Sequence, residues 1–277
     1  MIAAGAIDCE GAPRDLGFDQ GRACRAAIRA DARALGFGPG LRARAASLLA
    51  GGRGRRAALR RDLERHFPHL AERTAGIASG AGLPLEALVA LLARELLDPE
   101  RAAVEAAAFA ASAPPALELR LRSPDRLVRR SVAPDGGYAN LTIARPGLGA
   151  ALAGVNERGL AAAALPLGAP RTGERCQAPA VLLAEDCLER LDAVEKALEW
   201  CERRPGGGRA RLLFADATGA CGALEIDGEK RCRLGLGELG RARPEAAFDA
   251  RVDPTARSLS IERAGEPPER FVLASRS

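Results

Sequence analysis

The sequence contains few aromatic residues and almost no lysine. Aromatic residues make up 3% of the 277 residues, so a core would have to be filled mainly by Leu, Val, Ile and Ala. Lys196 and Lys230 are the only lysines, and Arg supplies nearly all the positive charge. Together with heavy use of Ala and Gly, this bias is typical of a GC-rich coding sequence. The net charge of +5 is therefore weak evidence for a nucleic-acid partner.

The chain also lacks a long apolar run and any Cys-x-x-Cys pair. Its N-terminal residues include Asp8 and Glu10, which predicts neither a signal peptide nor a membrane span. The seven cysteines are scattered and odd in number, which favours reduced thiols and a cytoplasmic location over a disulfide framework. We expect all seven to be small core side chains.

No metal site and no cofactor is expected. His66 and His69 are the only histidines, and they could present two ligands on one helix, but the sequence offers no third ligand beside them. The glycines of residues 235–240 match a dinucleotide fingerprint, yet Pro244 follows at once, where that fingerprint needs a helix. A turn between two strands is the preferred interpretation of this segment.

The hydrophobic pattern changes near residue 100. Before it, apolar residues recur at helical spacing, as in Leu59, Leu63, Phe67 and Leu70. After residue 110 the period becomes two, as in residues 117–121. The fold class is therefore predicted to be α+β, with a helical segment over residues 1–100 and a β-rich core over residues 101–277 that together form one continuous domain.

Several finer features are predicted. One long helix is expected from about Ala180 to Arg203, with Glu185 and Asp186 on its exposed side in local salt bridges. Turns are expected at residues 134–137, 156–159 and 216–219. The arginine runs at residues 53–61 and 120–130 have no interleaved aromatic residues, so they are interpreted as solvated faces.

One heptamer, Gly154-Val-Asn156-Glu-Arg-Gly159-Leu160, lies between two small apolar runs and predicts the tight end of a β-hairpin. In this setting it resembles the N-terminal nucleophile (Ntn) hydrolases, and most closely the peptidase family C45, that of the penicillin acyltransferases. Further segments resemble that family in the same order: Gly11-x-Pro13 with Gly17 and Gly21, then residues 67–83, 146–148 and 213–219. The resemblance covers most of the first 230 residues.

The resemblance implies a four-layer αββα sandwich and a nucleophilic cysteine that is released by self-cleavage after a glycine. The family's Cys-Thr-x-Phe segment aligns best with residues 106–109, which places Ala106 at the nucleophile. None of the 31 glycines is followed by Cys, Ser or Thr, so the usual self-processing has no bond to cleave. Asn156 matches an oxyanion-stabilising residue of the related hydrolases, and a turn residue is the equal alternative.

Three functional hypotheses remain open. The first is a catalytically degenerate C45-like homologue that binds an acylated or peptide-like ligand, alone or in a homo- or hetero-oligomer. The second is an active amide or thioester hydrolase, or acyltransferase, with a relocated nucleophile such as Cys176 or Cys221. The third, a basic anion or nucleic-acid binder, would show a steep salt dependence of binding. No membrane partner is expected.

Overall fold

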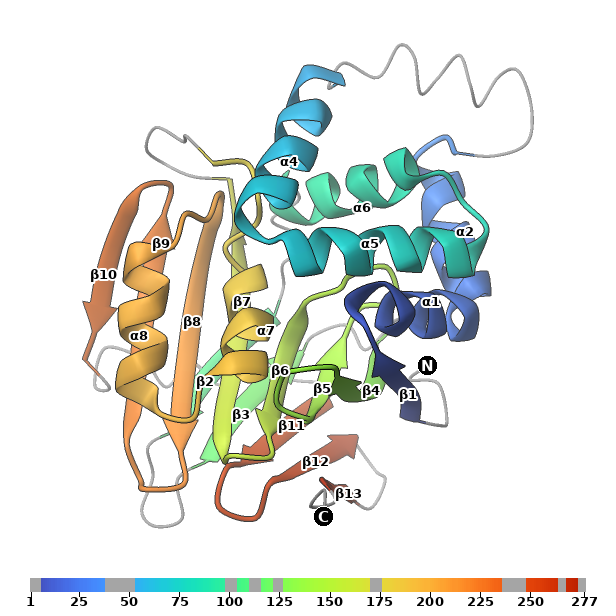
Figure 1. The fold of residues 1–277 in the computed structure, drawn as a ribbon. Helices are drawn as coiled ribbons and strands as arrows, with labels where there is room; N and C mark the ends of the chain where they lie inside the picture. Colours follow the sequence, from blue (N-terminus) through green and yellow to red (C-terminus); the bar gives the residue numbers. More distant parts are fainter. Residues whose placement is uncertain are drawn as a thin grey trace.

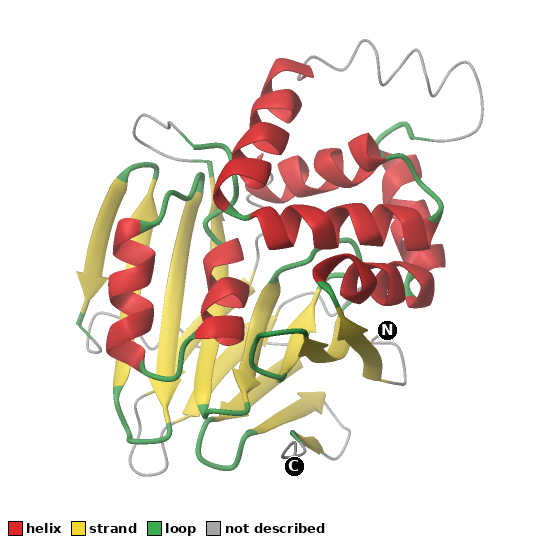
Figure 2. Ribbon diagram, in the orientation of Figure 1, coloured by secondary structure: helices red, strands yellow, loops and turns green. Residues whose placement is uncertain are grey.

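A computed structural model of the chain describes residues 6–37, 53–97, 104–109, 116–121, 127–169, 176–235, 248–263 and 268–273. In these residues, helices cover one face of an eight-stranded sheet and a five-stranded sheet packs on its other face (Figures 1 and 2). This arrangement confirms the predicted α+β class and the sandwich of two sheets.

The eight-stranded sheet is antiparallel except for its first pair, β1 and β4, which run parallel. Its strands in spatial order are β1 (Ala6–Gly11), β4 (Val128–Pro134), β5 (Asn140–Ala144), β6 (Ala151–Asn156), β7 (Leu160–Gly168), β8 (Arg209–Asp216), β9 (Cys221–Asp227) and β10 (Lys230–Leu234). Strand β1 was not predicted. Its signal is a short period of two, with Ile7 and Cys9 buried and Asp8 and Glu10 exposed, and the longer helical pattern that follows conceals it.

The five-stranded sheet is antiparallel throughout. Its strands in spatial order are β13 (Glu269–Val272), β12 (Ser258–Arg263), β11 (Phe248–Asp253), β3 (Ala116–Leu121) and β2 (Val104–Phe109). Strand β3 confirms the strand predicted around residues 117–121. No helix of the described ranges covers the outer face of this sheet, so these ranges show three of the four predicted layers.

Strands β6 and β7 lie at the centre of the sandwich and are buried on both faces. All six residues of β6 are buried, and so are all residues of β7 except Leu167. Leu152, Val155 and Leu165 pack towards the five-stranded sheet, whereas Leu160 packs towards the helices. Burial on both faces explains why these strands are continuous apolar runs without an alternating polar face.

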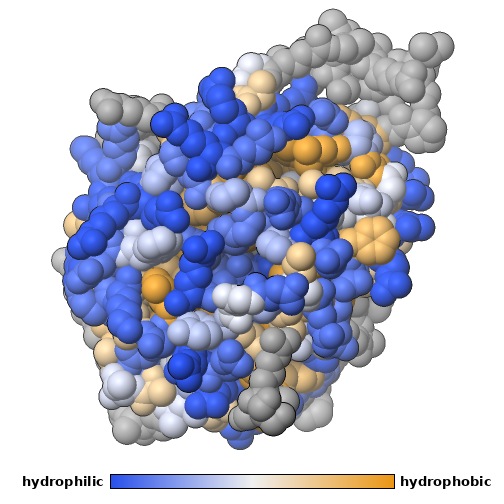
Figure 3. All heavy atoms as spheres, viewed as in Figure 1, coloured by the Kyte–Doolittle hydropathy of each residue, from blue (hydrophilic) through white to orange (hydrophobic). Residues whose placement is uncertain are grey.

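The structure describes seven helices, all in the layer on one side of the large sheet (Figure 1). They are α1 (Pro13–Ala23), α2 (Arg25–Ala34), α4 (Arg53–His66), α5 (Pro68–Ala81), α6 (Leu85–Leu97), α7 (Leu182–Arg190) and α8 (Val194–Arg203). Figure 3 shows that the outer surface of this layer is mostly hydrophilic.

Two helix boundaries differ from the prediction. The helix expected over residues 180–203 is two helices, because Leu191 and Ala193 adopt extended conformations. The apolar spacing from Leu59 to Leu70 also spans two helices, since α4 ends at His66 and α5 begins at Pro68. In both places the apolar stripe continues in phase across the break, so periodicity alone does not reveal it.

Helices α1 and α5 cross at four glycines. A Cβ atom on Gly17 would lie 2.0 Å from the carbonyl oxygen of Arg73, and one on Gly21 would lie 2.3 Å from that of Ile77. Gly76 and Gly80 on α5 approach the backbone of α1 in the same way, with 2.0 Å and 2.2 Å to carbonyl oxygens. The two pairs therefore bring the helix backbones into direct contact.

No single helix in the described ranges has both the length and the apolar character needed to cross a membrane. Helix α5 and residues Leu85–Arg94 meet those two criteria only as a pair, and the pair is bent by 116°.

The glycine crossing predicts a large effect of one methyl group. Gly17→Ala should lower the free energy of unfolding by about 2–3 kcal/mol, because α1 and α5 must separate to admit the new Cβ. Gly54→Ala on α4 is the matched control, because no atom lies within 4 Å of a Cβ at that position. It should be neutral, or stabilising by up to about 1 kcal/mol. Urea denaturation of both variants measures the difference, and equal effects would contradict the crossing.

Candidate functional site

Ala106, which the resemblance aligns with the nucleophile, lies inside β2 at the edge of the five-stranded sheet. Its Cα pairs with that of Leu119, and its neighbours on both sides are also paired with β3. An alanine side chain has no nucleophilic atom. The nitrogen of a residue inside a strand belongs to a peptide bond, so it is no free amine that could act as a base. This position therefore supplies neither part of the chemistry that the resemblance implies.

Asn156 lies at the end of β6, fully buried. Its Nδ2 donates to the backbone carbonyls of Leu188, at 2.9 Å, and Leu191, at 2.7 Å. Its Oδ1 accepts from the backbone N–H groups of Arg158, at 3.0 Å, and Leu160, at 2.9 Å. Both amide hydrogens thus bind carbonyls at the C-terminal end of α7, which would otherwise lack partners.

The other residues of the heptamer support the same contact. A Cβ on Gly154 would lie 2.5 Å from Cγ2 of Thr142 and 2.7 Å from the carbonyl oxygen of Leu141 on the neighbouring strand, and 3.1 Å from Cδ1 of Leu188 on α7. A larger residue would therefore crowd both the strand and the helix. Gly159 has a φ of 82°, the left-handed conformation that completes the predicted turn. The heptamer thus forms a hairpin end against which the end of α7 packs.

Asp216, in the segment 213–219 of the resemblance, positions α8. Its Oδ2 accepts from the backbone N–H of Val194, the first residue of that helix, at 3.0 Å. Its Oδ1 accepts from the backbone and the hydroxyl of Thr218. Burial alone would raise the pKa of Asp216, but these hydrogen bonds outweigh burial and lower it. A charged carboxylate at a helix N-terminus is also favoured by the helix dipole.

A cluster of buried charges lies between the helices and the large sheet. Glu185 on α7 accepts from Arg73 on α5 and, at 2.7 Å, from Arg130 on β4. Arg73 also donates to Glu189, one turn later on α7. All four side chains are less than 10% exposed. Two positive and two negative charges balance, which is the condition for burying them together.

Gln20 on α1 connects this cluster to the loop before β6. Its Oε1 accepts from Nη1 of Arg130 at 3.0 Å. Its Nε2 donates to the carbonyls of Pro146, at 2.9 Å, and Leu148, at 2.8 Å. The remaining Arg130 donor, Nε, binds the hydroxyl of Thr142 at 3.1 Å. The polar cluster is therefore extensively hydrogen-bonded within the protein.

A second group of polar side chains surrounds Asp186, the neighbour of Glu185 in sequence. Trp200 donates its indole N–H to Asp186 at 2.6 Å, and Nε of Arg190 lies 2.8 Å from the carboxylate. Nε2 of His69 lies 3.2 Å from the same carboxylate. Burial would raise the pKa of Asp186, but the nearby His69, the hydrogen bond of Trp200 and the charge of Arg190 outweigh it and lower the pKa.

These clusters correct two predictions. Glu185 and Asp186 are fully buried rather than exposed, because α7 is enclosed from Leu182 to Glu189 on every side. Arg130, at the end of a run interpreted as solvated, is 1% exposed. The sequence does contain a weak indication that Arg73 is buried, because Arg73 interrupts the apolar face of α5 between Leu70 and Ile77. The pairing of these residues with one another had no signal in the sequence.

The arginine runs and the glycine fingerprint of the sequence are described by the structure only in part. Residues 54–61 of α4 are exposed or half-buried except Leu59, as predicted for a solvated face. Residues 122–126, in the second arginine run, and residues 236–247, which include most of the glycine fingerprint, lie outside the described residues.

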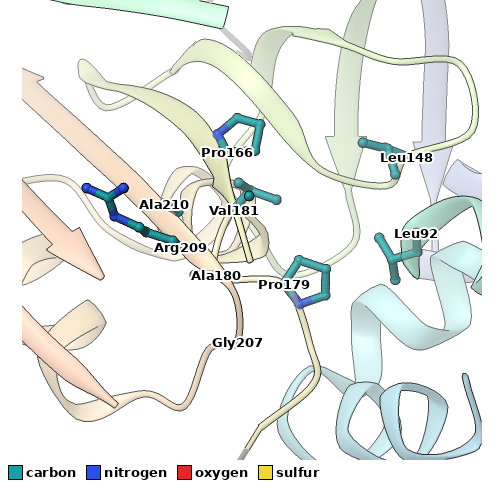
Figure 4. A pocket seen from close by; sticks show the side chains of 10 residues that line it. Leu92, Leu148, Pro166, Pro179, Ala180, Val181, Gly207, Arg209 and Ala210 are labelled. Carbon is teal, nitrogen blue, oxygen red and sulfur yellow. The ribbon is translucent and has the colours of Figure 1, made fainter. Parts of the chain in front are cut away.

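A small pocket opens between the end of the large sheet and α6 (Figure 4). Its wall is mainly apolar, with Leu92, Leu148, Pro166, Pro179 and Val181 around it and Arg209 as the charged residue. The space has room for about one water molecule. It is too small for an acyl group in this conformation.

The cysteines are all free thiols, and five of the seven are buried. The prediction of core positions is thus right for those five, but it is wrong for Cys232, which is exposed, and for Cys221, which is half-buried. Burial and the charge of Asp216 raise the pKa of Cys221. No group of three or more His, Cys, Asp or Glu residues in the described ranges has the arrangement of a metal site.

No protein-family model and no curated protein matches the chain. Solved structures show a partial likeness. Penicillin V acylase from Agrobacterium tumefaciens is 14% identical, with a TM-score of 0.39 over 49% of this chain and 70% of that one. A point mutant of conjugated bile acid hydrolase from Clostridium perfringens is 9% identical, with a TM-score of 0.40 over 57% of this chain and 88% of that one. Another variant of the same bile acid hydrolase is 16% identical, with a TM-score of 0.29 over 47% and 50%.

The buried cluster predicts that one carboxylate is essential for stability. Glu185→Gln should lower the free energy of unfolding by about 3–5 kcal/mol. The buried cluster would then hold the two positive charges of Arg73 and Arg130 and only one negative charge, that of Glu189. Glu64→Gln breaks the exposed pair with Arg60, 2.8 Å apart, and should change stability by about 0.5 kcal/mol or less. Chemical denaturation compares the two variants; a cost for Glu185→Gln as small as that of Glu64→Gln would refute the role of the cluster.

The lowered pKa of Asp186 predicts a specific acid sensitivity. The charged form stabilises the fold above the ordinary carboxyl pKa of about 3.9, and this contribution is lost as the pH falls through the lower folded value. Stability curves from pH 6 downward to about pH 2 should therefore fall less steeply for Asp186→Asn than for the wild type. Asp192→Asn is the control. The pKa of that carboxyl is also lowered, by Lys196, but the group is exposed to water and not buried. A slope unchanged in Asp186→Asn would contradict the assignment.

Proposed function

We propose that this chain is a homologue of the C45 acyltransferases and related Ntn hydrolases that does not process itself and has lost their chemistry. It binds an acylated or peptide-like small molecule in the cytoplasm, without a metal or cofactor. The observation that supports this proposal most is Ala106, an alanine inside a paired strand at the position of the nucleophile.

Asn156 supports the same conclusion. An oxyanion hole needs a donor that points at the developing charge. Both Nδ2 hydrogens of Asn156 are donated to the carbonyls of Leu188 and Leu191. In this arrangement the residue stabilises the end of α7, and it offers an external oxyanion no free side-chain hydrogen.

The alternative, an active enzyme with a relocated nucleophile, has less support. Cys221 lies on the five-stranded-sheet side of the large sheet, whereas His66 and His69 belong to helices on its other side. A raised pKa also leaves less of the reactive thiolate at neutral pH. Cys176 is buried in the core between the helices and the large sheet.

Intact mass and binding measurements test the proposal together. After purification, and again after prolonged incubation, a single species near 28.9 kDa is expected. With penicillin V and a conjugated bile acid as amide probes, we expect saturable binding by calorimetry with no product in the mass spectrum. Cleavage of the chain would overturn the alignment, and the new N-terminal residue would identify the nucleophile.

Turnover of either probe would favour the alternative. Cys176→Ala and Cys221→Ala then distinguish the two relocated nucleophiles, because only loss of the attacking thiol should abolish product formation. Cys24→Ala, which removes a buried thiol from the region of α1 and α2, is the matched control and should leave that turnover unchanged.

A further inference from the structure

Two of the buried thiols are in contact with each other. Sγ of Cys187 on α7 lies 3.6 Å from Sγ of Cys201 on α8, and both side chains are fully buried. Both are free thiols in this structure. The two are 14 positions apart, a spacing that matches no redox or metal motif, so the sequence does not reveal the pair.

The two sulfur atoms already lie within contact distance of each other. The sulfur atoms of a disulfide are about 2.05 Å apart, so these two would have to approach by about 1.5 Å. The connection between the helices, residues 191–193, is non-helical and half-buried, and it can absorb a small shift of α8. No metal is needed to explain the contact, because two neutral thiols pack as small apolar groups.

We propose that Cys187 and Cys201 form a redox-active dithiol that a small-molecule disulfide oxidises to a cross-link between α7 and α8. In the first step a thiolate of the pair attacks the oxidant R–S–S–R, releasing one R–S⁻ and leaving a mixed disulfide. In the second step the other thiolate displaces the second R–S⁻. Two S–H bonds are lost, one S–S bond forms, and the oxidant takes up the two electrons and two protons as two R–SH molecules.

The surroundings set the rate of this reaction. Burial, followed by the neighbouring Cys201 thiol, raises the pKa of Cys187 well above its ordinary value. The Cys187 thiol is therefore protonated at neutral pH, and a fully buried thiol reacts only when the helices open locally. The exposed Cys232 should react first with any oxidant, and oxidation of the pair should accelerate as the pH rises.

The cross-link would join the two helices that carry side chains of the buried polar clusters described above. Helix α7 carries Glu185 and Glu189, which bind Arg73, and α8 carries Trp200, which binds Asp186. A covalent bond between the two helices would close a loop from residue 187 to residue 201. It would restrict the unfolded chain and so favour the folded one.

The test uses the full chain in a Cys221→Ser/Cys232→Ser background, which removes the two thiols that are not buried. The protein is incubated with 2-hydroxyethyl disulfide at pH 8.5, then denatured and alkylated. Before alkylation, the intact mass should fall by about 2 Da, the mass of the two hydrogens lost. Of the five remaining thiols, two should be protected from alkylation. Tryptic peptides that contain residues 187 and 201 should be joined.

Matched variants complete the experiment. Cys201→Ala should abolish the protection of Cys187, whereas Cys9→Ala, which removes a buried thiol elsewhere, should leave the cross-link intact. The melting temperature of the oxidised protein should rise by several degrees and return after reduction with a phosphine. Protection of a different pair, no protection at all, or a cross-link that forms only in denaturant would each overturn the proposal.

Discussion

The double ion pair of Glu185 joins three parts of the molecule that are far apart in sequence. Its carboxylate binds Arg73 on α5 and Arg130 on β4, 112 and 55 positions away. Since these charges are shielded from water, they are tolerated only when each is paired in good geometry. Any other placement of α5 or α7 on the sheet would leave a buried charge without a partner. The glycine crossing acts together with this cluster, because the carbonyl of Arg73 lies directly against Gly17. The contact of α1 with α5 therefore fixes where Arg73 reaches the sheet, and Gln20 binds Arg130 from the same helix.

The motifs that resemble an acyl-transferring family serve the packing of helices in this chain. Gly154 leaves room for Leu188, and Asn156 binds the last carbonyls of α7. Asp216 binds the first N–H of α8. Part of each polar side chain binds a helix terminus, where backbone groups lack partners of their own, and the rest binds the adjacent turn. A chain could keep these motifs for stability after losing a nucleophile, and this is how the heptamer and Ala106 are reconciled in our proposal.

Local chemistry made part of this structure predictable. The turns at residues 156–159 and 216–219 form as expected, and the α+β class follows from the change of period. The break between α7 and α8 was not predictable, because the apolar spacing continues across it. Burial of Glu185 and Arg130 was not predictable either, because it depends on partners brought together only by the tertiary fold. For the candidate site, motif order selected Asn156 and Ala106, but sequence cannot show that the amide of Asn156 binds α7. The contact of Cys187 with Cys201 is another product of helix packing.

We propose that Asn156 stabilises the fold and takes no part in catalysis. The most direct test is hydrogen exchange of its side-chain amide, followed by NMR in ¹⁵N-labelled protein transferred to D₂O. If both hydrogens bind the carbonyls of Leu188 and Leu191, both should exchange far more slowly than those of an exposed asparagine, because exchange then requires local opening. Rapid exchange of either hydrogen would contradict the account, since it would show a donor that is free to bind an oxyanion.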